Sequence, residues 1–236
     1  MRKNVKKQLA LRVLSTAALM AMVSSIATAA FADTYDLNTG SVTVETKDDG
    51  YTYVTQENNS ATLDGYKDTD PKGVTITSYG QQTSNTITVE TAKDQTTNVT
   101  LQDVDMKVDT TEAKTGAIEI KGDGDTNLEL NGNNTVLVEN DWFNHQHAAI
   151  EKADKNGKGT LTIKDDKNND GSPKKEKDEN GNAIGGDTGK LLAGGYHDAA
   201  AIGGSGEADL RDTSNIIITG GDITASGGGY GAGIGG

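Results

Sequence analysis

The segment of residues 141–147 gathers side chains that could bind a sugar. It holds Trp142, Phe143 and Asn144, and Trp142 is the only tryptophan of the chain. A sugar-binding surface needs a flat apolar platform for the pyranose face with hydrogen-bonding groups beside it, and an exposed tryptophan next to asparagine and glutamine supplies both. The alternative for the same segment is packing, with both aromatic rings folded back over a corner of the structure.

Two tyrosines could extend such a platform. Tyr196 and Tyr230 each follow a pair of glycines, and they lie 34 positions apart. In a structure that repeats at about that distance they would stand on successive turns along one edge, where an aromatic row could bind a linear glycan. The same row could equally stabilise the interior, and two members do not decide between the two roles.

A charged segment near residue 170 offers oxygen donors for a cation. Asp166, Asn168 and Asp170, followed by glycine, match the opening of an EF-hand loop, in which alternating oxygen donors surround Ca²⁺ and glycine allows the sharp turn. Lys177 stands where the bidentate glutamate belongs, however, and Pro173 falls inside the loop. The segment therefore predicts either a Ca²⁺ site, the one cofactor that the sequence suggests, or a solvated loop.

No catalytic constellation stands out in the sequence. Carboxylates are abundant, with 35 Asp and Glu, but nothing in their spacing singles out an acid–base pair. Pectin-cleaving β-helices combine clusters of Asp with Arg or Lys, whereas the only arginine beyond residue 32 is Arg211. We therefore expect no catalytic residue, and a polysaccharide lyase or hydrolase is the least favoured function.

These residues must be positioned by a repeated element. Isoleucine follows a pair of small residues at Ile118, Ile150, Ile202 and Ile234, with gaps of 32, 52 and 32 residues, and a further copy at Ile184 falls inside the long gap. A period of this length indicates a solenoid, in which each unit buries its apolar face only against its neighbours. We expect the repeated isoleucines to stack inside one tube.

Short alternating segments lie between the isoleucine steps. Apolar residues alternate in them with polar ones, which places the apolar side chains on one face because successive side chains of a strand point to opposite sides. With the isoleucine step, each period holds three strands bounded by Gly, Asn and Asp turns. The sequence thus predicts an all-β fold, a right-handed parallel β-helix with three short strands per coil. The equivalent segments are 98–101, 127–130, 160–163 and 215–218 in one series, and 106–108, 136–138 and 223–225 in the other.

Three regions follow one another along the chain. Residues 1–32 combine a basic stretch, a short apolar run and an Ala-Phe-Ala cleavage site, as in a secretory signal peptide. Residues 33–97 alternate without a visible period and are interpreted as an N-terminal cap or early coils, with an antiparallel sandwich as the alternative. Residues 98–236 hold the repeats, with a charged loop insertion at 165–190. They stop in mid-repeat without a cap, so we expect the chain to be truncated at its C-terminus.

The charge balance narrows the possible partners. The formal net charge is −13, and it becomes −18 when the five basic residues of the signal peptide are removed. Such an acidic chain repels phosphate, so nucleic acids and anionic membrane surfaces are poor partners. The absence of cysteine rules out a disulfide framework. No membrane span is expected in the mature chain, because the apolar run of the signal peptide is shorter than the ~20 residues that a span needs.

The repeat motifs resemble those of a known family. Residues 115–125 (TGAIEIKGDGD), 215–225 (NIIITGGDITA) and 232–236 (AGIGG) are similar to secreted β-helical repeat proteins of Gram-positive bacteria, often labelled carbohydrate-binding-domain-containing or adhesin-like. The resemblance covers residues 98–236 and implies a secreted or cell-surface protein whose partner is a polysaccharide or a host or cell-surface glycan. It places no ligand residue on this chain. A passive stalk that displays a downstream domain is the alternative.

Overall fold

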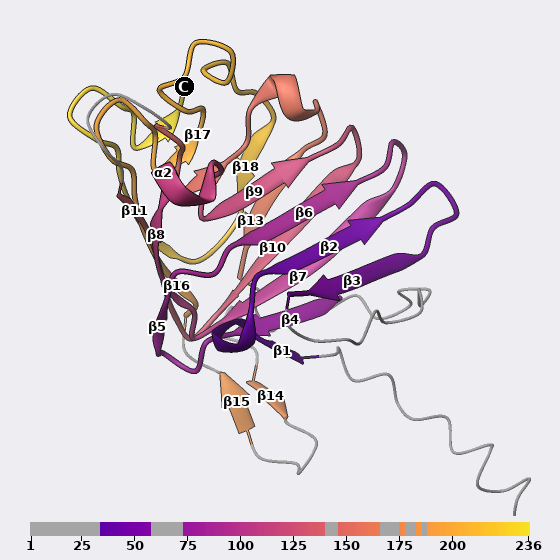
Figure 1. Cartoon of the computed structure of the whole chain (residues 1–236). Coiled ribbons are helices and arrows are strands. Elements are labelled where there is room, and N and C mark those ends of the chain that lie inside the picture. Colours follow the sequence, from indigo (N-terminus) through magenta and orange to yellow (C-terminus); the bar gives the residue numbers. More distant parts are fainter. Residues whose placement is uncertain (1–33, 58–72, 140–145, 166–174, 178–182, 186–187) are drawn as a thin grey trace, which may run out of the picture. The chain divides into compact units, whose positions relative to one another are not determined.

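The computed structural model describes residues 34–57, 73–139, 146–165, 175–177, 183–185 and 188–236. In this part of the chain successive strands pass around three sheets, so that most coils contribute one strand to each sheet in turn (Figure 1). The prediction of a parallel β-helix with three strands per coil is confirmed. The predicted signal peptide, residues 1–32, lies outside the described residues.

We name the three sheets A, B and C. Neighbouring strands run parallel in all of them, except that β3 runs antiparallel to β2 at the edge of sheet B. Sheet A consists of β1 (Thr34–Asp36), β4 (Val74–Thr77), β7 (Thr96–Gln102), β10 (Asp125–Asn131), β13 (Leu161–Lys164) and β18 (Ile216–Ile218). Sheet B consists of β3 (Thr52–Gln56), β2 (Val42–Thr46), β6 (Ile87–Thr91), β9 (Ile118–Lys121), β12 (Ile150–Glu151), β17 (Ile202–Gly203) and β20 (Ile234–Gly235). Sheet C consists of β5 (Gln82–Thr83), β8 (Asp105–Asp109), β11 (Asn133–Glu139), β16 (Lys190–Gly194) and β19 (Asp222–Ser226).

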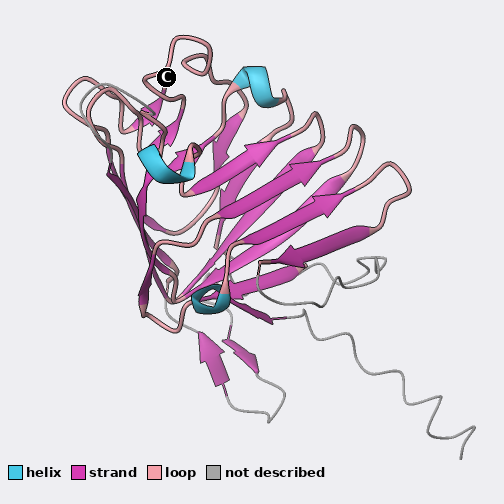
Figure 2. Cartoon of the chain, viewed as in Figure 1, coloured by secondary structure: helices cyan, strands magenta, loops and turns pink. Residues whose placement is uncertain are grey.

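Short helical turns occupy some of the connections between strands (Figure 2). At α2 the carboxylate of Asp109 accepts a hydrogen bond of 2.9 Å from the backbone N–H of Thr111, which caps the first turn. Lys114, with a φ of 58°, takes the left-handed conformation and ends the helix. The chain thereby passes from sheet C to sheet B within a few residues. The helical turns are η1 (Leu37–Thr39), α2 (Thr110–Ala113) and η2 (Asp154–Asn156).

The predicted isoleucine ladder is confirmed. Ile118 pairs with Ile150, Ile150 with Ile202 and Ile202 with Ile234 on adjacent strands of sheet B. The further copy at Ile184 is wrong, because β15 (Ala183–Gly185) pairs antiparallel with β14 (Lys175–Lys177) in a separate two-stranded sheet. The direct pairing of β12 with β17 leaves no place for another strand between them.

The alternating strands share the predicted face but not always the predicted register. Asn98 lies opposite Asn127 as expected. Leu128, however, lies opposite Ile163 and not Leu161, a shift of two residues. The second series, in sheet C, has the same shift. Val136 lies opposite Ala193, and Ala193 lies opposite Ala225, so Val136 is in register with Ala225 and not with Ile223. A shift of two keeps every side chain on its own face, so alternation alone does not exclude it.

The strands before β7 belong to the same coils. β4, β5 and β6 give one strand each to sheets A, C and B. An antiparallel sandwich, the alternative for this region, is not present in the described residues before β7, where antiparallel pairing is limited to β2 with β3.

A chain of threonine hydroxyls lies in the interior where sheet B turns into sheet A. Thr46 and Thr91 end β2 and β6, and Thr97 and Thr126 lie near the start of β7 and β10. Hydrogen bonds of 2.9, 2.7, 2.7 and 3.1 Å link the hydroxyls in order from Thr52 through Thr46, Thr97 and Thr91 to Thr126. All five residues are buried, and their hydroxyls therefore satisfy one another inside the coil. These hydrogen bonds between hydroxyls link the early coils through polar and not apolar side chains.

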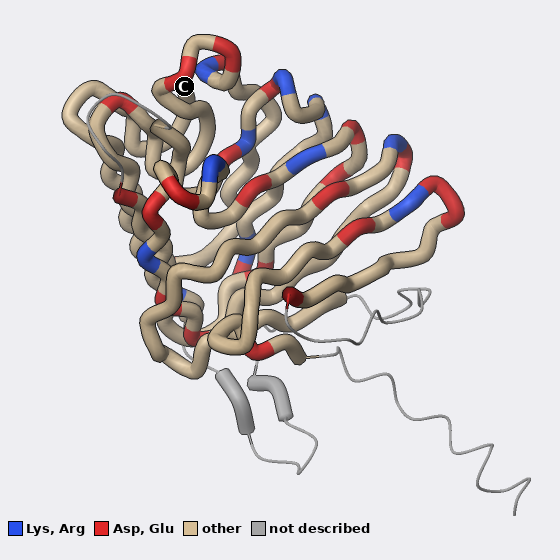
Figure 3. Tube along the Cα trace, viewed as in Figure 1, with Lys and Arg blue, Asp and Glu red and all other residues tan. Residues whose placement is uncertain are grey.

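Charged residues lie at many of the turns and along the strands (Figure 3). Some pair across adjacent coils, as Lys164 with Glu129 in sheet A at 3.2 Å and Lys107 with Glu139 in sheet C at 2.7 Å. The inward positions form one apolar core that runs through all three sheets. Within the described residues no helix is long and apolar enough to cross a membrane.

Candidate functional site

The corner between sheets C and B stacks three segments on one another. They are residues 146–149 before β12, 195–201 between β16 and β17, and 227–233 between β19 and β20. Backbone hydrogen bonds join the last two, from Gly228 N to Ala199 O (3.0 Å) and from Ala201 N to Ala232 O (3.1 Å). The small residues that precede each isoleucine let the coils approach closely here. Side chains of neighbouring corners are thereby brought together although they are far apart in sequence.

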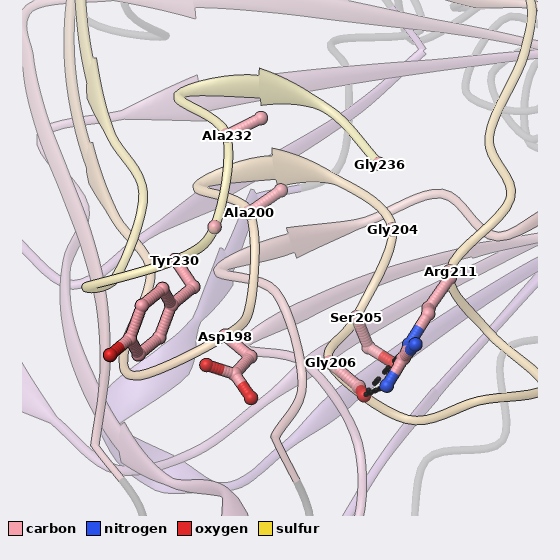
Figure 4. Close-up of a pocket in the computed structure, with 10 residues that line it drawn as sticks. Asp198, Ala200, Gly204, Ser205, Gly206, Arg211, Tyr230, Ala232 and Gly236 are labelled. Atoms are coloured by element: carbon pink, nitrogen blue, oxygen red, sulfur yellow. Dashed lines mark hydrogen bonds between the residues drawn. The ribbon is translucent and has the colours of Figure 1, made fainter.

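An open pocket of about 510 Å³ lies beside these corners. Figure 4 shows the ring of Tyr230 and the carboxylate of Asp198 on one side, and Ser205, Gly206 and Arg211 on the other. Alanines and glycines form most of the remaining lining and leave backbone groups accessible. The side chains contribute an aromatic ring, a carboxylate, a hydroxyl and a guanidinium, which is a set that suits a polar ligand with one apolar face.

Tyr230 presents its ring at the mouth of the pocket. The residue is 89% exposed. Its ring makes one edge contact with the ring of His197, with centroids 6.3 Å apart and 64° between the planes. The Nδ1 atom of His197 lies 3.1 Å from Nε2 of Gln146 and 3.0 Å from Oδ1 of Asp198. The ring of Tyr230 thus has one edge contact with the adjacent coil and otherwise stays accessible.

Arg211 is fixed by the loop that it closes, residues 204–211. Its Nε and Nη2 atoms both donate to the carbonyl oxygen of Gly206 at 3.2 Å. Two backbone hydrogen bonds of 2.9 Å, from Ser205 N to Leu210 O and from Leu210 N to Glu207 O, make the loop compact. Among the described residues Arg211 has no ion-pair partner. A guanidinium carries five N–H donors, so donors remain for a ligand in the pocket.

A buried histidine joins loop 204–211 to the neighbouring coil. His147 is only 5% exposed. Its Nδ1 lies 2.6 Å from Oε2 of Glu151, and its Nε2 lies 3.8 Å from Oε1 of Glu207. A backbone hydrogen bond of 2.7 Å from Gly206 N to Gln146 O runs alongside. The histidine therefore stands between a strand of sheet B and the loop that forms one wall of the pocket.

The electrostatics of this cluster favour the charged histidine. Burial by itself disfavours the imidazolium and lowers the pKa of His147, but the hydrogen bond with Glu151 and the charges of Glu151, Glu207 and Glu119 together outweigh it. The pKa of His147 is thus raised above its ordinary value of 6.5. Glu119 lies opposite Glu151 on the adjacent strand and is paired with Lys121 at 2.8 Å.

The structure places only some of the predicted site residues. Tyr230 lines the pocket, and Tyr196, 38% exposed, lies in the same corner of the preceding coil. Within the part of the chain that the structure describes, no group of three or more His, Asp or Glu side chains could hold a metal ion. The other predicted residues lie outside the described residues: Trp142, Phe143 and Asn144 of the sugar platform, and Asp166, Asn168 and Asp170 of the calcium loop.

The two tyrosines are not opposite each other. Strand pairing on both sides of the corner, Lys190 with Asp222 and Ile202 with Ile234, has an offset of 32 residues, whereas the tyrosines lie 34 residues apart. Tyr230 accordingly donates its backbone N–H to the carbonyl oxygen of His197 at 3.1 Å. The aromatic neighbour of Tyr230 on the adjacent coil is therefore His197.

Several residues of this site did not stand out in the sequence as ligand-binding residues. Asp198 belongs to no motif, and Arg211 is distinguished only as the lone arginine beyond residue 32. One signal was available. The connections from sheet B to sheet A lengthen along the chain, from residues 122–124 to 152–160 and then 204–215. In a solenoid a lengthened connection marks a surface loop whose role is separate from the core.

Three comparisons with known proteins find no match for this chain. A scan against protein-family models gives no match, and neither does a search of curated proteins or of solved structures. The function is therefore argued from the geometry of the pocket and from the sequence.

Proposed function

We propose that the chain is a secreted, cell-surface β-helical module that binds extracellular carbohydrate, as an adhesin or another glycan-binding protein does. One observation carries the proposal, the open pocket that the exposed Tyr230 lines together with Asp198, Ser205 and Arg211. The acidic composition and the signal-peptide pattern of residues 1–32 support export and disfavour nucleic acid as a partner.

The chemistry of the pocket suits a sugar ring. A pyranose has an apolar face of C–H groups that can pack on an aromatic ring, and hydroxyls around its rim that need donors and acceptors. Asp198 supplies an acceptor, Arg211 supplies donors, and Ser205 supplies both. A volume of about 510 Å³ lies within the usual range for small-molecule sites and leaves room for one or two sugar units.

Retention on immobilised glycans tests the proposal. We expect residues 33–236 to be retained by a polysaccharide or by members of a glycan array, and Tyr230→Asn to weaken that binding about tenfold, the equivalent of ~1.4 kcal/mol. Arg211→Gln should weaken it as well, because the guanidinium is the main donor of the pocket. Binding is measured by pull-down and by titration against the best glycan.

Tyr79→Asn is the matched control. Tyr79 is also an exposed tyrosine, at 64%, but it lies in an early coil, in the turn before β5, and does not line the pocket. Its loss should therefore leave binding unchanged. Equal loss in both variants, or none in Tyr230→Asn, would remove the pocket from the explanation. Failure of the wild-type chain to bind any glycan would leave the passive stalk as the better function.

A further inference from the structure

We propose that His147 is a pH-sensitive latch for the pocket, whose charged ring, held between Glu151 of β12 and Glu207, keeps loop 204–211 in place as the wall that carries Ser205 and Arg211. The consequence for ligand binding rests on the proposed function. The latch itself is a property of the loop and is measurable without any glycan.

The geometry makes His147 the buried link between sheet B and the loop. The hydrogen bond from its Nδ1 to Oε2 of Glu151 is 2.6 Å long, and both residues are nearly inaccessible, at 5% and 1% exposed. The other nitrogen faces Glu207 across 3.8 Å. Oε1 of Glu151 is buried and has no hydrogen-bond partner among the described residues, so this carboxylate depends on His147 for its compensation.

The remaining attachments of the loop do not respond to pH in the same way. Backbone hydrogen bonds join Gly206 to Gln146 (2.7 Å) and Gly204 to Gly235 (2.9 Å). A second ion pair of the loop with a described residue, Lys155 with Asp209 at 2.7 Å, is exposed on both sides. Exposed pairs contribute little to stability, because water and salt screen them. The contact between His147 and Glu207 differs from that pair because one of its partners, the ring of His147, is buried.

The charges around His147 fix the direction of the response. Carboxylates face it from three elements, Glu119 on β9, Glu151 on β12 and Glu207 on the loop, and Lys121 pairs with the first of them. When the ring loses its proton, Glu207 faces other carboxylates without the intervening charge, and the loop loosens. Because the pKa is raised on folding, the stabilisation is complete below about pH 6.5 and is lost as the pH rises through the higher pKa of the folded state.

Nuclear magnetic resonance of the folded chain tests the latch directly. We expect the amide signals of Gly206 and Glu207 to shift with pH along the same curve as the imidazole signals of His147, with a midpoint above 6.5. The hydrogen-exchange protection of the Gly206 amide should fall about two- to fivefold beyond the intrinsic pH effect as the ring loses its proton, as expected for the loss of one partly exposed charge pair. Loop amides that do not follow His147 would overturn the inference.

Two isosteric substitutions in the same loop separate the latch from a general charge effect. Glu207→Gln removes the charge that faces His147 and keeps the shape, so the loop amides should no longer follow the ring, although the ring still titrates. Asp209→Asn removes the partner of Lys155 and should leave the coupling intact. The reverse pattern, or coupling that persists in Glu207→Gln, contradicts the latch.

Glycan titrations at several pH values distinguish this inference from the proposed function. With the latch and the pocket both correct, affinity declines as the pH rises through the midpoint seen for His147, and Glu207→Gln lacks that decline. If no glycan binds but the amides follow His147, the proposed function fails and the latch stands. If a glycan binds with no coupling between loop and ring, the latch fails alone.

Discussion

A single methyl group placed at Gly159 tests the close stacking of the coils. Gly159 lies in the connection from β12 to β13, directly against Gly124 of the preceding coil. A Cβ atom at residue 159 would lie 1.7 Å from the carbonyl oxygen and 2.6 Å from the carbonyl carbon of Gly124. The backbone of Gly159 is not in the left-handed region, so alanine meets no conformational penalty there. The Gly159→Ala variant therefore measures steric contact between coils.

The cost follows from the displacement that this contact requires. Real Cβ contacts stay beyond 3.0 Å, so the connection must move back by more than about 1 Å. Each hydrogen bond lost in that movement contributes a net ~0.5–1.5 kcal/mol. Alanine restricts the unfolded chain and returns ~0.4–1 kcal/mol. We expect a net loss of about 2 kcal/mol, in the usual range for an overpacked site. The hydrogen bonds at risk are Gly159 N to Gly122 O (3.3 Å), Lys158 N to Asp123 Oδ1 (3.0 Å) and Thr160 N to Asp125 Oδ1 (2.9 Å).

Urea unfolding followed by circular dichroism gives the free energy, and Gly229→Ala is the matched control. At Gly229 the nearest atom to the new Cβ is 4.0 Å away, and the backbone is again outside the left-handed region. The control should be as stable as the wild type or slightly more stable, through the same effect on the unfolded chain. If Gly159→Ala is as stable as Gly229→Ala, the coils do not approach as closely as the structure shows.

Three further substitutions test the interior. Ile150→Ala should cost ~2–5 kcal/mol in urea unfolding because the residue is fully buried in the ladder, whereas Ile234→Ala, at a position 46% exposed, should cost clearly less; equal losses would contradict the ladder. Thr91→Val breaks the hydroxyl chain and should cost ~1–2 kcal/mol, against ~0.5 kcal/mol or less for the exposed Thr55→Val, and no difference would show that the chain adds nothing. Lys152→Met should remove a pH dependence of stability, because burial lowers the pKa of Lys152 in the folded chain. The wild type should lose stability as the pH falls from 10.5 towards that lower pKa, and a variant with the same slope would refute the argument.

The isoleucine ladder was predictable because copies of its three-residue step can be aligned with one another in only one register. The step of two small residues followed by isoleucine occurs at the same corner of four coils, where small side chains fit between neighbouring backbones. Ala149 and Ala201 are fully buried there, as are Ile150 and Ile202. Sequence spacing failed only where the charged insertion carries a similar step at Ile184, since a three-residue pattern does not reveal which sheet it joins.

The register of the other strands could not be predicted in the same way. Their alternating pattern is unchanged by a shift of two residues, so Leu161 and Ile163 are equally good partners for Leu128 by sequence alone. The choice depends on the length of the turns and on contacts inside the coil. At this corner the buried hydroxyl of Thr126 forms a hydrogen bond with the hydroxyl of Thr91, and Thr126 pairs with Leu161 on the next strand. Such contacts carry no periodic signal.

The candidate site was predictable only at its aromatic residue. Tyr230 stands out by type, but Asp198 and Glu207 are two among 35 acidic residues, and their importance comes from the side chains that they face in space. Some residues of the site lie about one period apart in the sequence, and others lie on opposite sides of a narrow sheet. Residues related in either way form no local sequence motif, so a motif search does not find them.

The narrowing of sheet B explains why the pocket lies on the late coils. In β17 and β20 this sheet is two residues wide, so the corner from sheet C and the connection to sheet A approach each other across it. Strand pairing places Gly203 next to Glu151 and Gly235 next to Gly203, so the outward positions filled by glutamate on β9 and β12 carry no side chain here. The pocket is lined instead by the corner and the connection on either side of this narrow sheet, among them Asp198, Arg211 and Tyr230. Its chemistry therefore comes from these flanking residues and not from the ladder.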